Sequence, residues 1–348
     1  SAASVLSTYN AENFDIVSTG YISQHERAHA TTYSLDQLTG PQSRYKFELK
    51  EWDGRSPMPL LDRNNLVIGI CAGQPRGDKS WDSVQHGASD LLEGARSRLR
   101  FNKKDLKHCR GGFPALAVGI SHGGGQGHPR MLAQELQNEP ILDGLMKEEP
   151  FQRISGFATR AFATWAPRLY NYQDNYLSKI IAQDQELRTT NKHPAPTEKE
   201  LRRNFVHTPW AATTLNFGPR TVCYKHADFG NLVFGWCSIT ALGNYDYKTG
   251  GHLILWELGL VIEFPPGSTI LIPSSAIHHS NTRIQSTERR YSFTQYSAGG
   301  IFRWIDNGYQ KSVDSQAAMD PVEKAKLFSD LSKQLEDGLA LYSTLEEL

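Results

Sequence analysis

The sequence is poor in cysteine, in net charge and in long apolar runs, and each shortage excludes a class of protein. The four cysteines among 348 residues form no Cys-x-x-Cys pair, so we expect neither a zinc site nor a disulfide framework. The formal net charge is zero, so contact with a polyanion would have to come from a local patch. No apolar run is long enough to span a membrane, and no signal-peptide pattern is present. These absences predict an intracellular protein in a reducing compartment, with no membrane partner.

The hydrophobic fraction of 39 % is ordinary for a globular protein, and its pattern changes along the chain. Residues 1–58 are polar and predict a loosely structured N-terminal lead-in. Within one domain at 59–310, apolar residues recur at helical spacing over 80–188 and then form short strand-like runs over 205–305. Many short strands with frequent turns are typical of a barrel or sandwich. Residues 311–348 are helical again, and their leucine stripe predicts a helix that packs on the core.

A possible metal-binding group begins at His226. Asp228 lies two residues further in a strand-like run, so the two side chains share one face. A histidine pair, His278 and His279, and then Arg290 follow among later strand-like runs. Two imidazoles and one carboxylate on one side of a metal leave other positions open, which suits non-haem iron(II) with a chelating co-substrate and oxygen. The spacing alone leaves open which of the two neighbouring histidines is the third ligand.

The sequence around these residues resembles the double-stranded β-helix oxygenases that use Fe(II) and 2-oxoglutarate. Within them it is most similar to the TET/JBP branch and its fungal members. The resemblance is carried by residues 225–228, 234–243, 250–253, 264–268 and 290–296. It implies an α+β fold with a double-stranded β-helix (jelly-roll, cupin-like) core buttressed by helices, and a catalytic domain at 59–310. It also implies Fe(II), 2-oxoglutarate and O2 as cofactors. His226, Asp228 and His279 would be the ligands of the iron.

The same resemblance assigns the residues that would hold 2-oxoglutarate. The planar guanidinium of Arg290 suits a bidentate pair with the far carboxylate of the co-substrate. Ser292 shares its strand face and would add a hydroxyl donor. Arg220 precedes His226 by an even number of residues, so strand parity predicts that it also faces inward and holds the near carboxylate.

A glycine-rich stretch, Gly119-x-Ser121-x-Gly123 followed by Gly124, has more than one interpretation. It matches the nucleophile elbow of serine hydrolases, but that motif needs a helix directly after the serine, and here more glycines and Pro129 follow. It is otherwise a flexible turn, or a loop whose backbone can approach a ligand because glycine has no Cβ. The fungal relatives have a similar stretch, which favours a substrate-site role for Ser121, Gly123 and Gly124.

The resemblance implies a DNA substrate in which the methyl group of 5-methylcytosine is oxidised to hydroxymethyl, formyl and carboxyl forms. The base must leave the duplex to reach a buried metal. Asn231 would read the base edge and Tyr296 would stack on the base. The base-contacting histidine of the family is replaced here by Ala298, so 6-methyladenine is a second possible substrate. A DNA substrate implies a nuclear location, and a monomer is expected.

A basic stretch runs from Arg96 to Arg110 and contains one acid, Asp105. Such a stretch is either a solvated face or, with a DNA substrate, a contact to the phosphate backbone.

Two rival functions remain open. An oxygenase of the same fold that acts on protein or small molecules is favoured by the neutral net charge. A non-catalytic DNA-binding or cupin-like module is disfavoured, because such a module has no need of the four residues His226, Asp228, His279 and Arg290 together.

Overall fold

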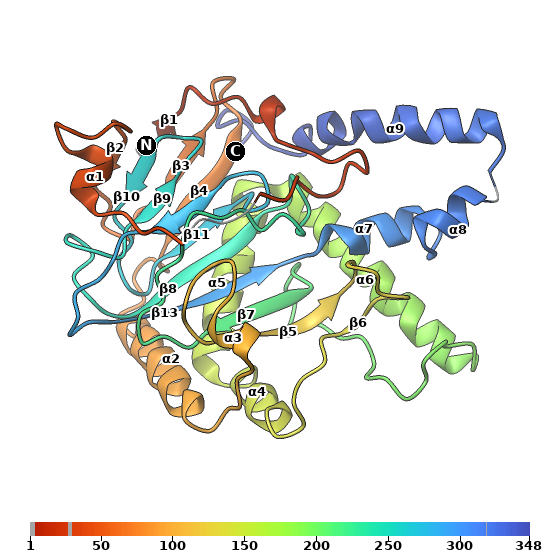
Figure 1. The fold of residues 1–348 in the computed structure, drawn as a ribbon, viewed down its shortest axis with the longest axis horizontal. Coiled ribbons are helices and arrows are strands. Elements are labelled where there is room, and N and C mark those ends of the chain that lie inside the picture. The colour runs from red at the N-terminus through yellow and green to blue at the C-terminus, as the bar shows by residue number, and fades with distance from the viewer. Residues whose placement is uncertain (1–3, 27–29, 318) are drawn as a thin grey trace.

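The computed structural model describes residues 4–26, 30–317 and 319–348, in which helices surround two β-sheets (Figure 1). The larger sheet has the strand order β1-β3-β4-β11-β8-β13-β7-β5-β6, and the smaller has the order β12-β9-β10-β2. The strands are β1 (Val5–Leu6), β2 (Glu48–Lys50), β3 (Met58–Leu61), β4 (Val67–Gly73), β5 (Ala115–Ser121), β6 (Arg130–Met131), β7 (Ala212–Asn216), β8 (Cys237–Asn244), β9 (Leu253–Leu255), β10 (Leu260–Ile262), β11 (Thr269–Ile272), β12 (His279–Asn281) and β13 (Arg289–Tyr296).

The strands from β7 to β13 are divided between the two sheets in an order that defines the fold. In the larger sheet β7, β13, β8 and β11 are adjacent and antiparallel. In the smaller sheet β12, β9 and β10 are adjacent and antiparallel. The segment that ends at His226 extends this smaller sheet, because His226 forms a bridge with His279 on β12. Two four-membered layers connected in this order form a double-stranded β-helix, which confirms the predicted α+β fold with a jelly-roll core.

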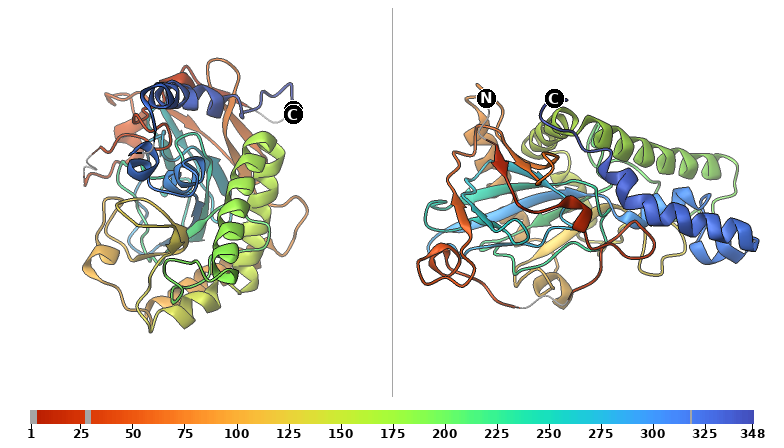
Figure 2. Two further views of the ribbon diagram at one scale, coloured as in Figure 1. Left: turned by 90° about the vertical axis from the view of Figure 1, so that its right-hand side faces the viewer. Right: turned by 90° about the horizontal axis from the view of Figure 1, so that it is seen from above.

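Helices cover the outer face of the larger sheet (Figure 2). The central helix of this layer, α5, presents a buried stripe at helical spacing, and its Phe151 ring lies 5.3 Å from that of Phe293 on β13. Burial of this stripe holds β13, which carries Arg290, against a rigid layer. The helices are η1 (Ala11–Asn13), α1 (Leu35–Thr39), α2 (Trp81–Arg96), α3 (Lys103–Leu106), α4 (Glu139–Leu145), α5 (Glu149–Trp165), α6 (Pro167–Thr189), α7 (Gly299–Asp306), α8 (Ser312–Ala317) and α9 (Pro321–Leu339).

The two ends of the chain add to this core. The N-terminal residues supply β1 beside β3 in the larger sheet and β2 beside β10 in the smaller one. Helix α9 reaches the core through its C-terminal end, where a Cβ at Gly338 would lie 2.3 Å from the Phe234 ring and where Leu339 is buried. Its N-terminal half is solvated, with Phe328 60 % exposed. Among the described residues, no helix is long and apolar enough to cross a membrane.

Candidate active site

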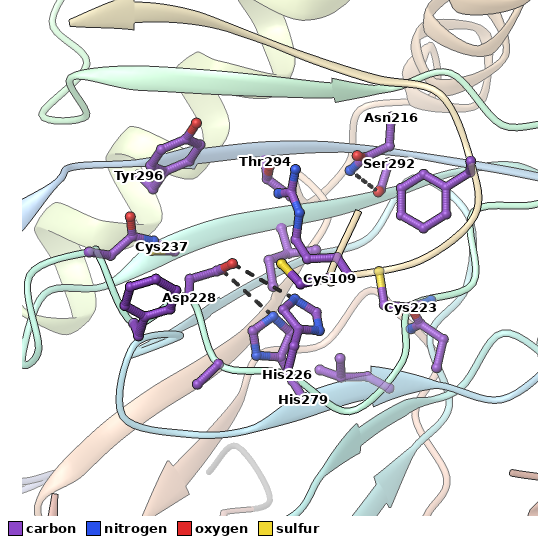
Figure 3. A pocket seen from close by; sticks show the side chains of 18 of the residues that line it. Cys109, Asn216, Cys223, His226, Asp228, Cys237, His279, Ser292, Thr294 and Tyr296 are labelled. Atoms are coloured by element: carbon purple, nitrogen blue, oxygen red, sulfur yellow. Dashed lines mark hydrogen bonds and ion pairs between the residues drawn. The ribbon is translucent and has the colours of Figure 1, made fainter. Parts of the chain in front are cut away.

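Two histidines and one aspartate meet between the two sheets. Nε2 of His226 lies 3.7 Å from Oδ1 of Asp228, and Nε2 of His279 lies 3.8 Å from Oδ2 of the same carboxylate (Figure 3). The three ligand atoms all lie within 4.8 Å of one another. In the part of the chain that the structure describes, no other group of His, Cys, Asp or Glu side chains meets this condition. The three residues that the sequence singled out are therefore brought together.

Backbone hydrogen bonds set the positions of these three residues. His226 and His279 exchange N–H···O bonds of 3.2 and 2.9 Å across a single antiparallel bridge. The amide of Asp228 donates to the carbonyl of Ser274 at 2.8 Å, which places the carboxylate just beyond that bridge. The ligand-bearing segment is thus tied both to β12 of the smaller sheet and to the loop that follows β11 of the larger one.

The orientation of each imidazole is determined by its second nitrogen. Nδ1 of His226 donates to the carbonyl of Tyr224 at 2.8 Å, and Nδ1 of His279 donates to the carbonyl of Ile277 at 3.1 Å. A ring nitrogen that donates carries a proton, and in the neutral imidazole the other nitrogen, Nε2, then carries a lone pair. Both lone pairs are therefore directed toward Asp228, as metal ligation requires.

The protonation states also suit a metal. Burial, followed by the neighbouring His279, lowers the pKa of His226 to about 3, so this imidazole is neutral at neutral pH. Burial by itself raises the pKa of Asp228, but His226, His279 and Arg110 outweigh it and leave the pKa below its ordinary value. The site therefore offers two imidazole nitrogens and one carboxylate oxygen, the donor set that non-haem iron(II) takes with open positions.

The neighbouring histidines have other partners. His278 binds Glu257 through Nδ1 at 2.6 Å and Glu26 through Nε2 at 3.3 Å, so both of its nitrogens are engaged outside the metal group. His252 is fully buried, with Nδ1 2.8 Å from Oγ1 of Thr282. Between the two adjacent histidines, it is His279 that the structure places beside Asp228.

Arg290 lies in the same pocket, which has a volume of about 310 Å³. Its side chain is 1 % exposed, Nη1 donates to the carbonyl of Thr221 at 2.7 Å, and Nε has no hydrogen-bond partner. No acidic side chain of the described residues lies within ion-pairing distance of it. A buried, uncompensated cation is costly, so this guanidinium fits the carboxylate of a bound co-substrate.

Ser292, the second residue predicted to hold the co-substrate, lies close to Arg290 in the chain. It lies two positions after Arg290 on β13 and lines the same pocket. Nδ2 of Asn216 donates to its hydroxyl oxygen at 2.8 Å, so the hydroxyl proton is free to point into the pocket. The structure therefore places Ser292 as predicted, with an amide that orients its hydroxyl group.

Arg220 does not belong to this site, and the prediction that it faces inward is wrong. Its side chain is exposed and does not line the pocket. Strand parity ends with β7 at Asn216, because Gly218 turns the chain with φ +56° against the Tyr291 ring. A different cation, Arg110, lines the pocket from a loop. The backbone carbonyl of Arg110 accepts a 2.8 Å hydrogen bond from the amide of Tyr224. Strand pattern could not identify Arg110, because it lies outside the barrel strands.

The glycine-rich stretch also lies away from the pocket, so the predicted substrate role of Ser121, Gly123 and Gly124 is not supported. Ser121 ends β5 and pairs with Arg130 on β6, so the glycines form the connection of a hairpin at the sheet edge. That connection packs on the start of α7, where a Cβ at Gly300 would lie 2.3 Å from the carbonyl oxygen of His122. No helix follows the serine, so the nucleophile elbow is absent as well.

This placement predicts that Ser121→Ala leaves turnover within about twofold of the wild type, because the substitution touches neither ligand nor pocket. Steady-state assays of 2-oxoglutarate consumption check this. A large loss of activity in a folded Ser121→Ala protein would contradict this placement and would show that the glycine-rich stretch contributes to the active site.

Asn231 and Tyr296, predicted to contact the substrate, both line the pocket. The amide of Asn231 points toward Ser274 and Cys237, with Nδ2 3.4 Å from each side chain. The Tyr296 hydroxyl accepts a 3.1 Å hydrogen bond from Thr214, and Figure 3 shows the ring across the cavity from the two histidines. One lining residue that the sequence did not suggest is Phe229, which is 37 % exposed at the pocket edge.

No family model and no curated protein matches the chain. Among solved structures, it is similar to NgTET1 in complex with 5mC DNA, with 15 % identity over 76 % of this chain and 87 % of that one and a TM-score of 0.37. A 2OG-Fe(II) oxygenase family oxidoreductase from Burkholderia pseudomallei has 14 % identity over 64 % and 93 %, with a TM-score of 0.32. The viral collagen prolyl hydroxylase of Paramecium Bursaria Chlorella virus-1, in its 2OG complex, has 14 % identity over 34 % and 70 %, with a TM-score of 0.20. Likeness at this level carries no weight for function.

The fold and the site together nevertheless define a class. A double-stranded β-helix holds two histidines and one carboxylate, and a buried, unpaired arginine faces the same pocket. This is the arrangement of the Fe(II)- and 2-oxoglutarate-dependent oxygenases, and the donor set fits Fe(II), 2-oxoglutarate and O2 as cofactors.

Proposed function

We propose that the chain is an Fe(II)- and 2-oxoglutarate-dependent dioxygenase that oxidises the methyl group of 5-methylcytosine in DNA. The observation that carries the oxygenase chemistry is the meeting of His226, Asp228 and His279 in one pocket with the unpaired guanidinium of Arg290. When bound, iron would supply the oxidising chemistry, in which one oxygen atom of O2 enters the substrate C–H bond and the other enters 2-oxoglutarate, which loses CO2 to give succinate.

The residues of the chain would orient the reactants. Arg290 and Ser292 would bind the far carboxylate of 2-oxoglutarate and so direct its other end toward the ligand group. The carbonyls of Tyr224 and Ile277 keep both imidazoles in the ligating tautomer. Burial between the sheets would exclude bulk water from the reacting atoms.

The choice of a DNA base as substrate is supported by the pocket wall. Asn231 offers an amide that can both donate and accept, as recognition of a base edge requires. Tyr296 offers an aromatic face for stacking. A volume of about 310 Å³ is within the range of small-molecule pockets, and a single flipped base is a ligand of that class. Nuclear localisation follows as part of this proposal.

The residues that would read the base do not restrict the substrate to cytosine. Ala298 forms a backbone bridge with Asn231, and its methyl group supplies no hydrogen bond to a base. Reading of the base would therefore rest on Asn231, whose amide can pair with cytosine or adenine edges. Demethylation of 6-methyladenine is consequently included in the proposal as a further activity.

Mass spectrometry of nucleosides after incubation with methylated DNA, Fe(II) and 2-oxoglutarate tests this assignment. DNA with 5-methylcytosine is expected to give 5-hydroxymethylcytosine and then the formyl and carboxyl forms, with succinate produced in step. DNA with 6-methyladenine tests the second activity in the same assay. Succinate production that never alters either nucleoside would favour an oxygenase of the same fold that acts on protein or small molecules.

A further inference from the structure

The segment that leads into the pocket carries an uncompensated positive charge. Over 98–110 it holds six cations and a single acid, and none of the six forms an ion pair with a described residue. The acid, Asp105, accepts a 2.7 Å hydrogen bond from the amide of Asn102 in the capping box of α3. Five of the cations have exposed side chains, and we call them the α3 strip: Arg98, Arg100, Lys103, Lys104 and Lys107.

The α3 strip is a fixed surface. The Asn138 side chain bonds both backbone groups of Arg100, accepting from its amide at 2.8 Å and donating to its carbonyl at 2.7 Å. Leu99, between two of the cations, is buried. Nε2 of His108 lies 3.1 Å from the carbonyl oxygen of Phe113 and closes the loop after α3. The charges therefore project from a backbone that is held in place at both ends of the strip.

The strip is continuous with the pocket. The sixth cation, Arg110, lies three residues after Lys107 and lines the pocket, and its carbonyl is bonded to Tyr224, two residues before His226. Figure 1 shows α3 and the loop that follows it in front of the larger sheet. A row of solvated cations thus ends at a residue that lines the pocket of the metal ligands, although the whole chain has a formal net charge of zero.

We propose that the α3 strip binds the phosphate backbone of the DNA strand that carries the target base. This inference rests on the proposed function. A flipped base can reach the ligands only if the flanking backbone is held beside the pocket opening. Clustered, unpaired lysines and arginines supply that contact without sequence preference, because they neutralise phosphates and release counterions.

The test replaces three strip lysines together, as Lys103→Gln, Lys104→Gln and Lys107→Gln. A matched control removes the same charge from α9, as Lys324→Gln, Lys326→Gln and Lys333→Gln, none of which forms an ion pair with a described residue. Fluorescence anisotropy measures the dissociation constant for a duplex with 5-methylcytosine at several salt concentrations. The slope of log affinity against log salt is negative, and each lost phosphate contact makes it shallower by about 0.9, so the slope of the strip variant is expected to be shallower by about 2 to 3. The control is expected to keep the slope of the wild type.

The outcomes separate this surface from the proposed function. If the wild type binds with a steep salt dependence and the strip variant keeps the same slope, the strip is only a solvated face and this inference is overturned. If the wild type itself shows no salt-dependent binding and alters no nucleoside, while it still converts 2-oxoglutarate to succinate, the DNA substrate fails and the strip assignment fails with it. Thermal melting of each variant confirms that loss of binding is not loss of fold.

Discussion

Replacing His279 with alanine is expected to abolish Fe(II) binding and oxidation, whereas the same change at the adjacent His278 leaves both intact. Nε2 of His279 faces Asp228 at 3.8 Å, while His278 is engaged with Glu257 and Glu26. Removing a group that only orients a metal ligand already costs about 10- to 100-fold, so the loss of a ligand should exceed about 100-fold. Anaerobic calorimetry with Fe(II) and assays of 2-oxoglutarate turnover measure the two effects.

His226→Ala extends this comparison to the other imidazole. It should eliminate turnover but leave DNA binding measurable, because the α3 strip does not include this residue. The pair of neighbouring substitutions at 278 and 279 serves as the internal control, since both remove one imidazole from the same segment. Full oxidation by His226→Ala under metal-free conditions would contradict the assigned chemistry.

Arg290→Ala is expected to raise the KM for 2-oxoglutarate by about 30-fold or more. Removal of one partner from a buried, hydrogen-bonded charge pair costs about 2 to 5 kcal/mol, and about 1.4 kcal/mol is a factor of ten. The guanidinium is buried, and no acidic side chain of the described residues pairs with it, so the co-substrate carboxylate is the partner that is lost. Steady-state kinetics with varied 2-oxoglutarate measure the change.

Two controls sharpen the prediction for Arg290. Arg289→Ala removes the adjacent guanidinium, which is 62 % exposed and 3.9 Å from Glu93, and should leave the KM unchanged. Arg290→Lys keeps the charge but loses the planar fork, so it should restore only part of the affinity. An unchanged KM in a folded Arg290→Ala protein would remove this residue from the co-substrate site.

Much of the fold could be predicted because the hydrophobic pattern has a physical cause that is local. Helical spacing over 80–188 indicates the helices that cover the larger sheet, and the short strand-like runs over 205–305 indicate its central strands, although β5 and β6 of that sheet also lie within 80–188. His226 and Asp228 could be paired from the sequence because side chains two residues apart in an extended segment share one face. Arg290 and Ser292 follow the same rule on β13, where both line the pocket.

The errors arose where local periodicity ends. The prediction that Arg220 faces inward assumed that β7 continues to this residue. The strand ends at Asn216, and Gly218 turns the chain before Arg220. The glycine-rich stretch has the composition of a ligand-binding loop, but hairpin pairing of β5 with β6 places it at a sheet edge. Arg110 was visible only as one member of a basic run, because its position at the pocket depends on a backbone contact with Tyr224, far away in sequence.

The sequence by itself therefore determined which residue types are available for the chemistry. It also determined where the central strands follow one another along the chain and which residues of a strand share a face. The tertiary structure decided which of these residues meet. It placed His279 rather than His278 beside Asp228, left Arg290 buried without an acidic partner among the described residues, and brought Arg110 of the basic loop to the pocket wall. The reason is that periodicity follows from local backbone geometry, whereas the meeting of distant residues depends on how the sheets and loops pack together.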